Sequence, residues 1–373
     1  MSSGRARLRR VDVDGPGFGR RKAGKGFAYY DCDGELITDK EVIAHIKALA
    51  IPPAWREVWI CPDASGHIQA VGVDDRGRRQ YRYHDDWRAR RDRAKHDRVL
   101  EVARRLPQLR ARLEHDLALE GLGRDRVLAC AVRLIELGLF RVGGETYADE
   151  NGSYGLATLR KGHVRDQGGE LRFDYPGKSG QRRVVTIGDP QVAEVVRALK
   201  RRRRGGPELL AYKDERGRWV DVRSSDINDY LQEALDGVTA KDFRTWTATV
   251  LAAVGLAVEQ DAGTEPQRRS AVARVVRSVA HQLGNTPAVA RGSYVDPRVI
   301  EHFEAGYTVG DELDGQEVEA IAEDLGVVEH DEPVDPDDDV AVDAVPPDVL
   351  AEVEEAVVDL IERSPRRRAR RST

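Results

Sequence analysis

The 373-residue chain is poor in several residue types that mark common classes of functional site. Its three cysteines, Cys32, Cys61 and Cys130, lie far apart and form no CxxC pair, which argues against a zinc ribbon and a redox dithiol. A sparse, odd cysteine count is typical of the reducing cytosol. The sequence also lacks a glycine-rich nucleotide loop and a cluster of carboxylates that could hold a metal ion. We therefore expect a reaction that needs no ATP, no metal ion and no other cofactor.

Long apolar segments are absent as well. The longest uninterrupted run of apolar residues and glycine, Val250–Val258, is far too short to span a bilayer. The N-terminal sequence MSSGRARLRR lacks the apolar core of a signal peptide. These features predict a cytoplasmic protein with no membrane partner.

The net charge of −5 hides two regions of opposite sign. Residues 311–362 carry 21 acidic and no basic side chains, and six arginines follow from Arg363 onward. Residues 1–310 carry 54 basic and 44 acidic side chains, a net charge of about +10. A basic body favours a polyanionic partner such as nucleic acid, although a highly charged surface on any soluble protein is the alternative.

Four segments differ in composition and pattern. Residues 1–26 are basic and glycine-rich, which predicts a flexible N-terminus. Residues 27–88 contain short strand-like runs separated by DG, ASG and DRG turns, which predict a small β-rich domain. Residues 89–308 place apolar residues three and four apart and predict a larger, mainly helical domain. Residues 309–373 form an acidic tail that we expect to be largely disordered, with an amphipathic helix over 349–361 and a basic end. The predicted fold class is α+β.

The helical domain is interrupted by one strong β pattern. The runs LRFDY and RRVVTI flank Pro176-Gly177-Lys178-Ser179-Gly180, which are turn residues around a single lysine. This pattern predicts a β-hairpin with Lys178 at its tip.

Five scattered residues form a set whose chemistry suits attack on a phosphodiester: Arg141, Lys178, Arg244, Asn285 and Tyr294. A tyrosine phenol can act as the in-line nucleophile, because its phosphate ester stores the bond energy and the attack is reversible. Two arginines can hold the nonbridging oxygens through bidentate hydrogen bonds. A lysine can protonate the leaving 5′ oxygen, and an asparagine can donate one more hydrogen bond to the developing charge.

Each of these residues also has an ordinary structural explanation. Arg141 ends a predicted helix, Lys178 occupies a turn, and Arg244 opens an apolar helix where an acid could pair with it. Asn285 suits a turn or an N-cap before a proline, and Tyr294 suits a half-buried position. Taken singly, the structural explanations are favoured, and only the set as a whole indicates a site.

The phrases that contain these residues resemble the type IB DNA topoisomerases, in particular the small poxvirus-like and bacterial members. The order is IPPAW, GRRQYRYH, FRVGGETY, GLATLRKGHV, GKSG, KDFRTW, LGNTP and SYVDP. The resemblance runs from about Asp31 to Phe303. It implies the tyrosine recombinase/topoisomerase IB catalytic fold, with a DNA-binding domain over 27–88 and a catalytic domain over 89–308. It also implies a monomer whose two domains form a clamp around duplex DNA.

The resemblance also implies roles for the five residues. Tyr294 would form a 3′-phosphotyrosyl link, Arg141 and Arg244 would hold the scissile phosphate, and Lys178 would be the general acid. Asn285 stands where poxviral and nuclear members usually carry histidine; because asparagine does not titrate, we expect it to act only by hydrogen bonding. The implied function is relaxation of supercoiled DNA by transient cleavage of one strand, swivelling and religation.

Four further residues match DNA-contacting positions of that family: Gln80, Tyr81, Tyr83 and Tyr147. In the run QYRY, Tyr81 and Tyr83 would share one face of a strand. The alternative for this pair is an ordinary role as sheet aromatics.

Two other functions remain open at this stage. A tyrosine recombinase or integrase shares the chemistry, but such enzymes generally carry His-x-x-Arg, and the corresponding phrase here is Lys241-Asp242-Phe243-Arg244. A non-catalytic DNA-binding protein of the same fold is the other possibility. The C-terminal tail could bind its own body, compete with DNA there, or bind a protein partner.

Overall fold

The computed structural model describes residues 8–144, 152–313, 315–327, 340–342 and 347–363. The chain divides between Lys95 and His96 into two compact units. The division falls inside helix α2 (Asp85–Ala103), seven residues beyond the boundary predicted from composition. The Arg-rich stretch at this boundary is therefore helical. Among the described residues, no helix combines the length and apolar character needed to cross a bilayer.

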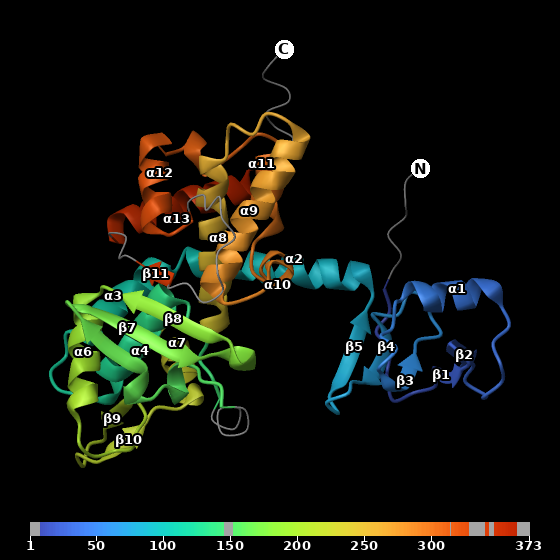
Figure 1. Ribbon diagram of the computed structural model, residues 1–373, viewed down its shortest axis with the longest axis horizontal. Helices are drawn as coiled ribbons and strands as arrows, with labels where there is room; N and C mark the ends of the chain where they lie inside the picture. The colour runs from blue at the N-terminus through green and yellow to red at the C-terminus, as the bar shows by residue number, and fades with distance from the viewer. Residues whose placement is uncertain (1–7, 145–151, 314, 328–339, 343–346, 364–373) are drawn as a thin grey trace. The chain divides into compact units, whose positions relative to one another are not determined.

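The first unit is a five-stranded antiparallel sheet with one helix (Figure 1). Its strand order is β2-β1-β3-β4-β5. The elements are β1 (Phe18–Ala23), β2 (Gly26–Tyr30), α1 (Lys40–Ala48), β3 (Arg56–Ile60), β4 (Ile68–Val73) and β5 (Arg79–Tyr83). Ile46, Ile60 and Ala70 form its small core, against which Val42 and Val58 pack.

Strand β1 corrects the prediction that residues 1–26 form a flexible N-terminus. Residues 18–23 pair with β2 on one side and with β3 on the other. Arg20 fixes this strand, because its guanidinium donates to the carbonyls of Ile51 at 3.2 Å and Pro52 at 2.6 Å. These acceptors are about 30 residues away in sequence, so local composition gave no sign of the strand.

The second unit is mainly helical, as the spacing of apolar residues predicts. Its helices before the tail are α3 (Leu106–Leu117), α4 (Arg124–Gly138), α6 (Pro190–Arg201), α7 (Ser224–Ala234), α8 (Ala240–Val258), α9 (Glu265–Leu283), α10 (Pro287–Ser293) and α11 (Pro297–Glu304). Helix α8 is the centre of this unit, because nearly all of its residues are buried and it contacts α4, α9, α11 and both tail helices. A helix that is apolar on all sides is stable only when neighbours surround it.

The predicted hairpin is present at one side of this helical body. β6 (Val164–Gln167), β7 (Glu170–Pro176) and β8 (Arg182–Ile187) pair antiparallel, and the single-turn helix η3 (Lys178–Gly180) lies between β7 and β8. A separate pair, β9 (Ala211–Lys213) and β10 (Trp219–Asp221), follows. This mixed α/β architecture agrees with the predicted fold class.

The tail contains more structure than its composition suggests. After the single turn η4 (Val309–Asp311) come α12 (Gly315–Asp324), β11 (Val340–Val342) and α13 (Pro347–Glu362). Helix α12 is not predicted by the sequence pattern; it forms where Val318, Ile321 and Ala322 become buried on the catalytic body. Figure 1 shows α12 and α13 beside α8, and β11 alongside β8, to which it pairs in parallel.

Candidate active site

Four of the five predicted site residues line one cavity of about 340 Å³ in the second unit. They come from four separate elements, so only the tertiary fold brings them together. The predicted members are Arg141, Lys178, Arg244 and Asn285, and further lining residues include Tyr154, Tyr175 and Arg183.

Arg244 lies in the first turns of α8 and is 4% exposed. Its guanidinium donates to the carbonyls of Leu139 and Leu283, the latter at 2.7 Å. Its Nε is buried and has no hydrogen-bond partner among the described residues. Burial, together with the neighbouring charge of Arg141, lowers the pKa of Arg244 to about 10, so the group is still cationic at neutral pH.

Arg141 and Asn285 orient one another. The Nη2 of Arg141 donates to Asn285 Oδ1 at 2.6 Å and to the carbonyl of Gly284 at 3.3 Å. Because the amide oxygen is used by Arg141, the Asn285 amide presents its donor side elsewhere, and its Nδ2 is buried without a hydrogen-bond partner among the described residues. Within the described part of the chain, the site therefore holds two buried donors that lack acceptors, Arg244 Nε and Asn285 Nδ2.

Two residues in the left-handed backbone conformation bring Arg141 and Asn285 to the cavity. Leu139, with φ of 50°, ends α4 and turns the chain toward Arg141. Gly284, with φ of 57°, ends α9, and the Asn285 N–H then bonds back to the Ala280 carbonyl at 2.9 Å. Glycine is the residue that adopts this conformation at least cost, and it is common at the end of a helix.

Lys178 is the first residue of η3, directly after β7, and its side chain is exposed at the cavity. The hairpin thus carries a flexible amine to the wall formed by Arg141, Arg244 and Asn285. This position suits a residue that must reach a substrate atom rather than a residue that supports the fold.

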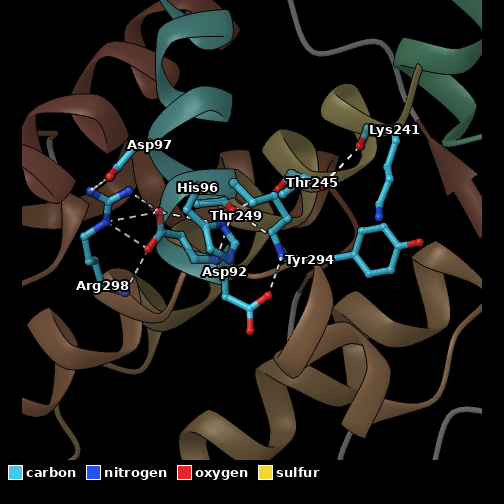
Figure 2. A network of polar contacts seen from close by, with 10 residues as sticks. Asp92, His96, Asp97, Lys241, Thr245, Thr249, Tyr294 and Arg298 are labelled. Atoms are coloured by element: carbon cyan, nitrogen blue, oxygen red, sulfur yellow. Dashed lines mark hydrogen bonds and ion pairs between the residues drawn. The ribbon is translucent and has the colours of Figure 1, made fainter. Parts of the chain in front are cut away.

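Tyr294 lies next to this cavity, at the end of α10, and is 8% exposed. The centre of its ring is 5.5 Å from the guanidinium carbon of Arg244. Its carbonyl accepts from Thr249 Oγ1 at 3.3 Å, and the same hydroxyl oxygen of Thr249 accepts from the Asp296 N–H at 3.1 Å. Figure 2 shows the Tyr294 ring pointing away from this backbone anchor.

Two opposing effects act on the Tyr294 phenol. Burial favours its neutral form and would raise its pKa, but the positive charges of Arg244 and Arg141 outweigh burial. The net result is a pKa of Tyr294 below the ordinary tyrosine value. A phenol that ionises more readily is a better nucleophile at a given pH.

Arg183 is the main member of the cavity wall that the sequence analysis missed. From β8 it donates to the carbonyls of His281, at 3.0 Å, and Gln282, in the last turn of α9. Burial and the charge of Arg141 lower the pKa of Arg183, against an opposing effect of Tyr175. One cue was available: Arg183 lies on the Lys178 hairpin, five residues after the lysine. Its partners on α9 are about 100 residues away, so no local phrase marks it.

In the first unit, Tyr81 and Tyr83 are exposed on one face of β5, each at 38%, with their rings stacked 6.0 Å apart. The Arg79 guanidinium lies 5.8 Å from the Tyr81 ring. Gln80 lies on the opposite face of the strand, where its amide donates to Asp74 at 3.0 Å. The fourth predicted DNA-contacting residue, Tyr147, lies outside the described residues.

Comparison with known proteins identifies the class. Residues 84–307 match the family described as eukaryotic DNA topoisomerase I, catalytic core, and residues 26–74 match the bacterial DNA topoisomerase IB N-terminal domain. The chain therefore belongs to the type IB DNA topoisomerases, a family of isomerases that bind duplex DNA.

Individual relatives agree with this assignment. The chain is 34% identical over 297 residues to DNA topoisomerase 1B of Acanthamoeba polyphaga mimivirus, covering 77% of this chain and 88% of that protein. It is 22% identical over 289 residues to DNA topoisomerase 1B of vaccinia virus strain Copenhagen, covering 72% and 87% of the two chains. The match to DNA topoisomerase 1 beta of Arabidopsis thaliana is 25% identical over 216 residues, 56% of this chain and 22% of that protein.

Proposed function

We propose that this type IB topoisomerase relaxes supercoiled duplex DNA through a covalent bond to Tyr294. The phenolate oxygen attacks the phosphorus in line, the bond between phosphorus and the 5′ oxygen breaks, and a 3′-phosphotyrosyl ester forms. Lys178 gives a proton to the departing 5′ oxygen. The free end then swivels. The 5′ hydroxyl attacks the phosphorus again, Lys178 recovers its proton, and Tyr294 leaves. Because the ester keeps the bond energy, the cycle consumes no ATP.

Arg141, Arg244 and Asn285 bind the nonbridging oxygens in this proposal. The positive charge of the two arginines and the N–H donors of all three residues stabilise the additional negative charge of the pentacovalent transition state. The donors are held in place before DNA arrives, since Arg244 is fixed by two carbonyls and Arg141 by Asn285 and Gly284. A preorganised donor set avoids reorganisation at the moment of reaction.

The observation that carries the proposal is a pair of buried donors, Arg244 Nε and Asn285 Nδ2, for which the described residues provide no acceptor. They lie beside a phenol whose pKa is lowered by two guanidiniums. A buried donor without an acceptor costs about 1–3 kcal/mol. An anionic oxygen bound in the cavity would remove that cost. A purely structural site would satisfy these donors with protein groups.

The two-domain clamp is also part of the proposal. The first unit would contact the duplex through the exposed face of Arg79, Tyr81 and Tyr83, and the second unit would hold the scissile phosphate as a monomer. Such a binding mode depends mainly on phosphates. Affinity should then fall with salt, with a log–log slope of about −0.9 for each phosphate contacted. This substrate would place the enzyme at the nucleoid.

Plasmid relaxation tests the proposal directly. Purified protein is mixed with supercoiled plasmid in excess EDTA without ATP, and relaxation is followed with time. We expect the wild type to relax the plasmid and Tyr294→Phe to be inactive and to form no covalent adduct. Persistence of relaxation and of an adduct in Tyr294→Phe would remove Tyr294 from the nucleophile role.

The role of Lys178 has its own test. Lys178→Ala should slow single-turnover cleavage by about 10²–10⁴-fold, the usual contribution of a general acid. A substrate with a 5′-thio leaving group needs no protonation and should restore most of that loss. A loss of the same size on both substrates would exclude Lys178 as the acid.

A further inference from the structure

The C-terminal helix α13 is docked on the catalytic unit of its own chain. Its apolar face is buried through Val353, Val357, Leu360 and Ile361, each at most 4% exposed. The helix contacts α8, α11 and η4. It lies beyond the residues 84–307 that match the topoisomerase I catalytic core. The amphipathic pattern predicted over 349–361 thus has a partner within the chain.

One acidic residue points into this interface instead of out of it. Glu354 is 8% exposed, and its carboxylate accepts from Arg110 on α3 through Nη1 at 2.7 Å and Nη2 at 3.0 Å. The same carboxylate accepts from the indole Nε1 of Trp246 at 2.8 Å. Arg110 is itself held by Glu136 on α4 at 2.6 Å. Three donors on one buried carboxylate compensate for its loss of hydration.

The Trp246 bond connects this interface with the site. Trp246 and Arg244 both belong to α8, two residues apart, and successive residues of an α-helix are about 100° apart around its axis. The two side chains therefore leave the helix on nearly opposite sides. Fixing the Trp246 indole on the α13 side fixes the rotation of α8 that directs Arg244 toward Leu139, Leu283 and the cavity.

A second tail segment contacts the other side of the site. The Nε2 of Gln282, three residues before Asn285, donates to the carbonyls of Leu325 and Gly326 after α12, the latter at 3.0 Å. The tail thus contacts both helices, α8 and α9, whose ends meet at the carbonyl of Leu283 and the guanidinium of Arg244. The acidic tail therefore contains supports for the site in addition to its charge.

We propose that Glu354 is a positioning residue for strand cleavage: from α13, it holds α8 through Trp246 and Arg110 in the rotation that presents Arg244 to the scissile phosphate. This inference rests on the proposed function, because it assumes that Arg244 contacts the phosphate. It also assigns α13 to its own chain and not to a partner molecule.

Single-turnover cleavage of a suicide duplex by the full-length chain tests the inference. Displacing a catalytic group by about 1 Å can cost on the order of 10²-fold. We expect Glu354→Ala to lower the cleavage rate constant by about 10–100-fold. The Kd for duplex DNA, measured in a Tyr294→Phe background, should change by less than about twofold, because Glu354 is buried and its carboxylate offers no contact to a phosphate. The matched control is Glu355→Ala, which removes the same charge from an exposed neighbouring position and should cleave like the wild type.

A double variant separates positioning from stability. If Glu354 acts through Arg244, then Glu354→Ala should slow the wild type but add no further loss to Arg244→Ala. A folded Glu354→Ala that melts at a lower temperature yet cleaves at the wild-type rate would overturn the proposal. If Glu354→Ala fails to fold, Trp246→Phe decides, since it removes the indole N–H, together with part of the ring, and leaves Glu354 and Arg110 in place. A wild-type cleavage rate in that variant would overturn the proposal equally. Failure of the proposed function is distinguishable, because then the wild type itself would form no adduct at Tyr294.

Discussion

Four arginines of the second unit, two buried and two half-buried, fall into two groups with opposite surroundings. Arg110 and Arg133 face carboxylates: Arg110 is paired with Glu136 and Glu354, and Arg133 with Glu136 at 2.9 Å and Asp189 at 3.1 Å. Burial alone would lower the pKa of both arginines, but the carboxylates outweigh burial and raise it. Neighbouring carboxylates neutralise the charge of these arginines. Their role is therefore to connect the segments that carry those carboxylates.

Arg244 and Arg183 instead donate to backbone carbonyls and lie near a third guanidinium, that of Arg141. Burial and Arg141 lower the pKa of both. A carbonyl orients a guanidinium without neutralising it, so the cavity keeps a positive field. The comparison shows how one residue type supports the fold in one place and binds an anion in another, according to the acceptors that hold it.

Arg244→Ala should give the largest effect on catalysis. The variant loses a preorganised cation at the phosphate, and removing one such donor typically costs about 10²–10³-fold. Single-turnover cleavage of a suicide duplex measures the loss. Arg244→Lys should restore little, because an ammonium cannot reach two carbonyls and a phosphate oxygen at once. Full activity in the lysine variant would show that only the charge matters.

Asn285→Asp gives the cavity arginines the surroundings of the other group. It places a carboxylate beside arginines that now donate to neutral oxygens. The substitution changes the side-chain volume little, and the new carboxylate should pair with the Arg141 guanidinium, whose Nη2 lies 2.6 Å from the present amide oxygen. We expect cleavage to fall by about 10²-fold with no loss in melting temperature, since the new ion pair competes with the phosphate. A variant that cleaves at the wild-type rate would mean that the cavity does not need its positive field.

Arg133→Met should lower stability and leave cleavage unchanged, which is the reverse of the result expected for Asn285→Asp. It removes a half-buried cation from the buried carboxylates of Glu136 and Asp189. Breaking a fully buried pair typically destabilises a protein by about 3–5 kcal/mol, which is the upper limit expected here. Chemical denaturation should show this loss, while the cleavage rate of the folded variant at about 25 °C should stay within about twofold of the wild type. A marked loss of cleavage without a loss of stability would contradict the separation of the two groups.

The pH dependence of cleavage should show the smallest but most specific effect. The reactive form of Tyr294 is the phenolate, so the rate should rise with pH and level off above the pKa of Tyr294. The guanidiniums hold that pKa below the value of free tyrosine, about 10. Arg141→Ala removes one positive charge and should move the midpoint to higher pH. An unchanged midpoint would show that Arg141 does not act on the phenol.

Local patterns predicted much of the second unit. The spacing of apolar residues over 89–308 predicts helices, and α8 (Ala240–Val258) and α9 (Glu265–Leu283) are two of them. The hairpin around Lys178 also follows from turn residues between two β-rich runs. These elements depend on neighbours in sequence, which is why one sequence is sufficient to predict them.

Contacts between distant segments could not be predicted in this way. Glu354 and Arg110 are 244 residues apart, and nothing in either local sequence indicates the other. Strand β1 was not predicted either, because the carbonyls that hold its Arg20 lie beyond residue 50. Helix α12 was not predicted because it is stabilised by packing on α8, which is distant in sequence. For the site, the recognisable phrases located four residues of one cavity and Tyr294 beside it, but their catalytic roles stay predictions. Arg183 was missed because its partners lie on another element.

The most direct measurement of the central claim uses a duplex with a neutral methylphosphonate at the scissile position. If Arg244 acts by binding a charged nonbridging oxygen, removing that charge makes the arginine less necessary. The penalty of Arg244→Ala relative to the wild type should then shrink by about tenfold or more on the methylphosphonate. An equal penalty on the phosphate and the methylphosphonate would contradict the account, because Arg244 would then not be binding that oxygen.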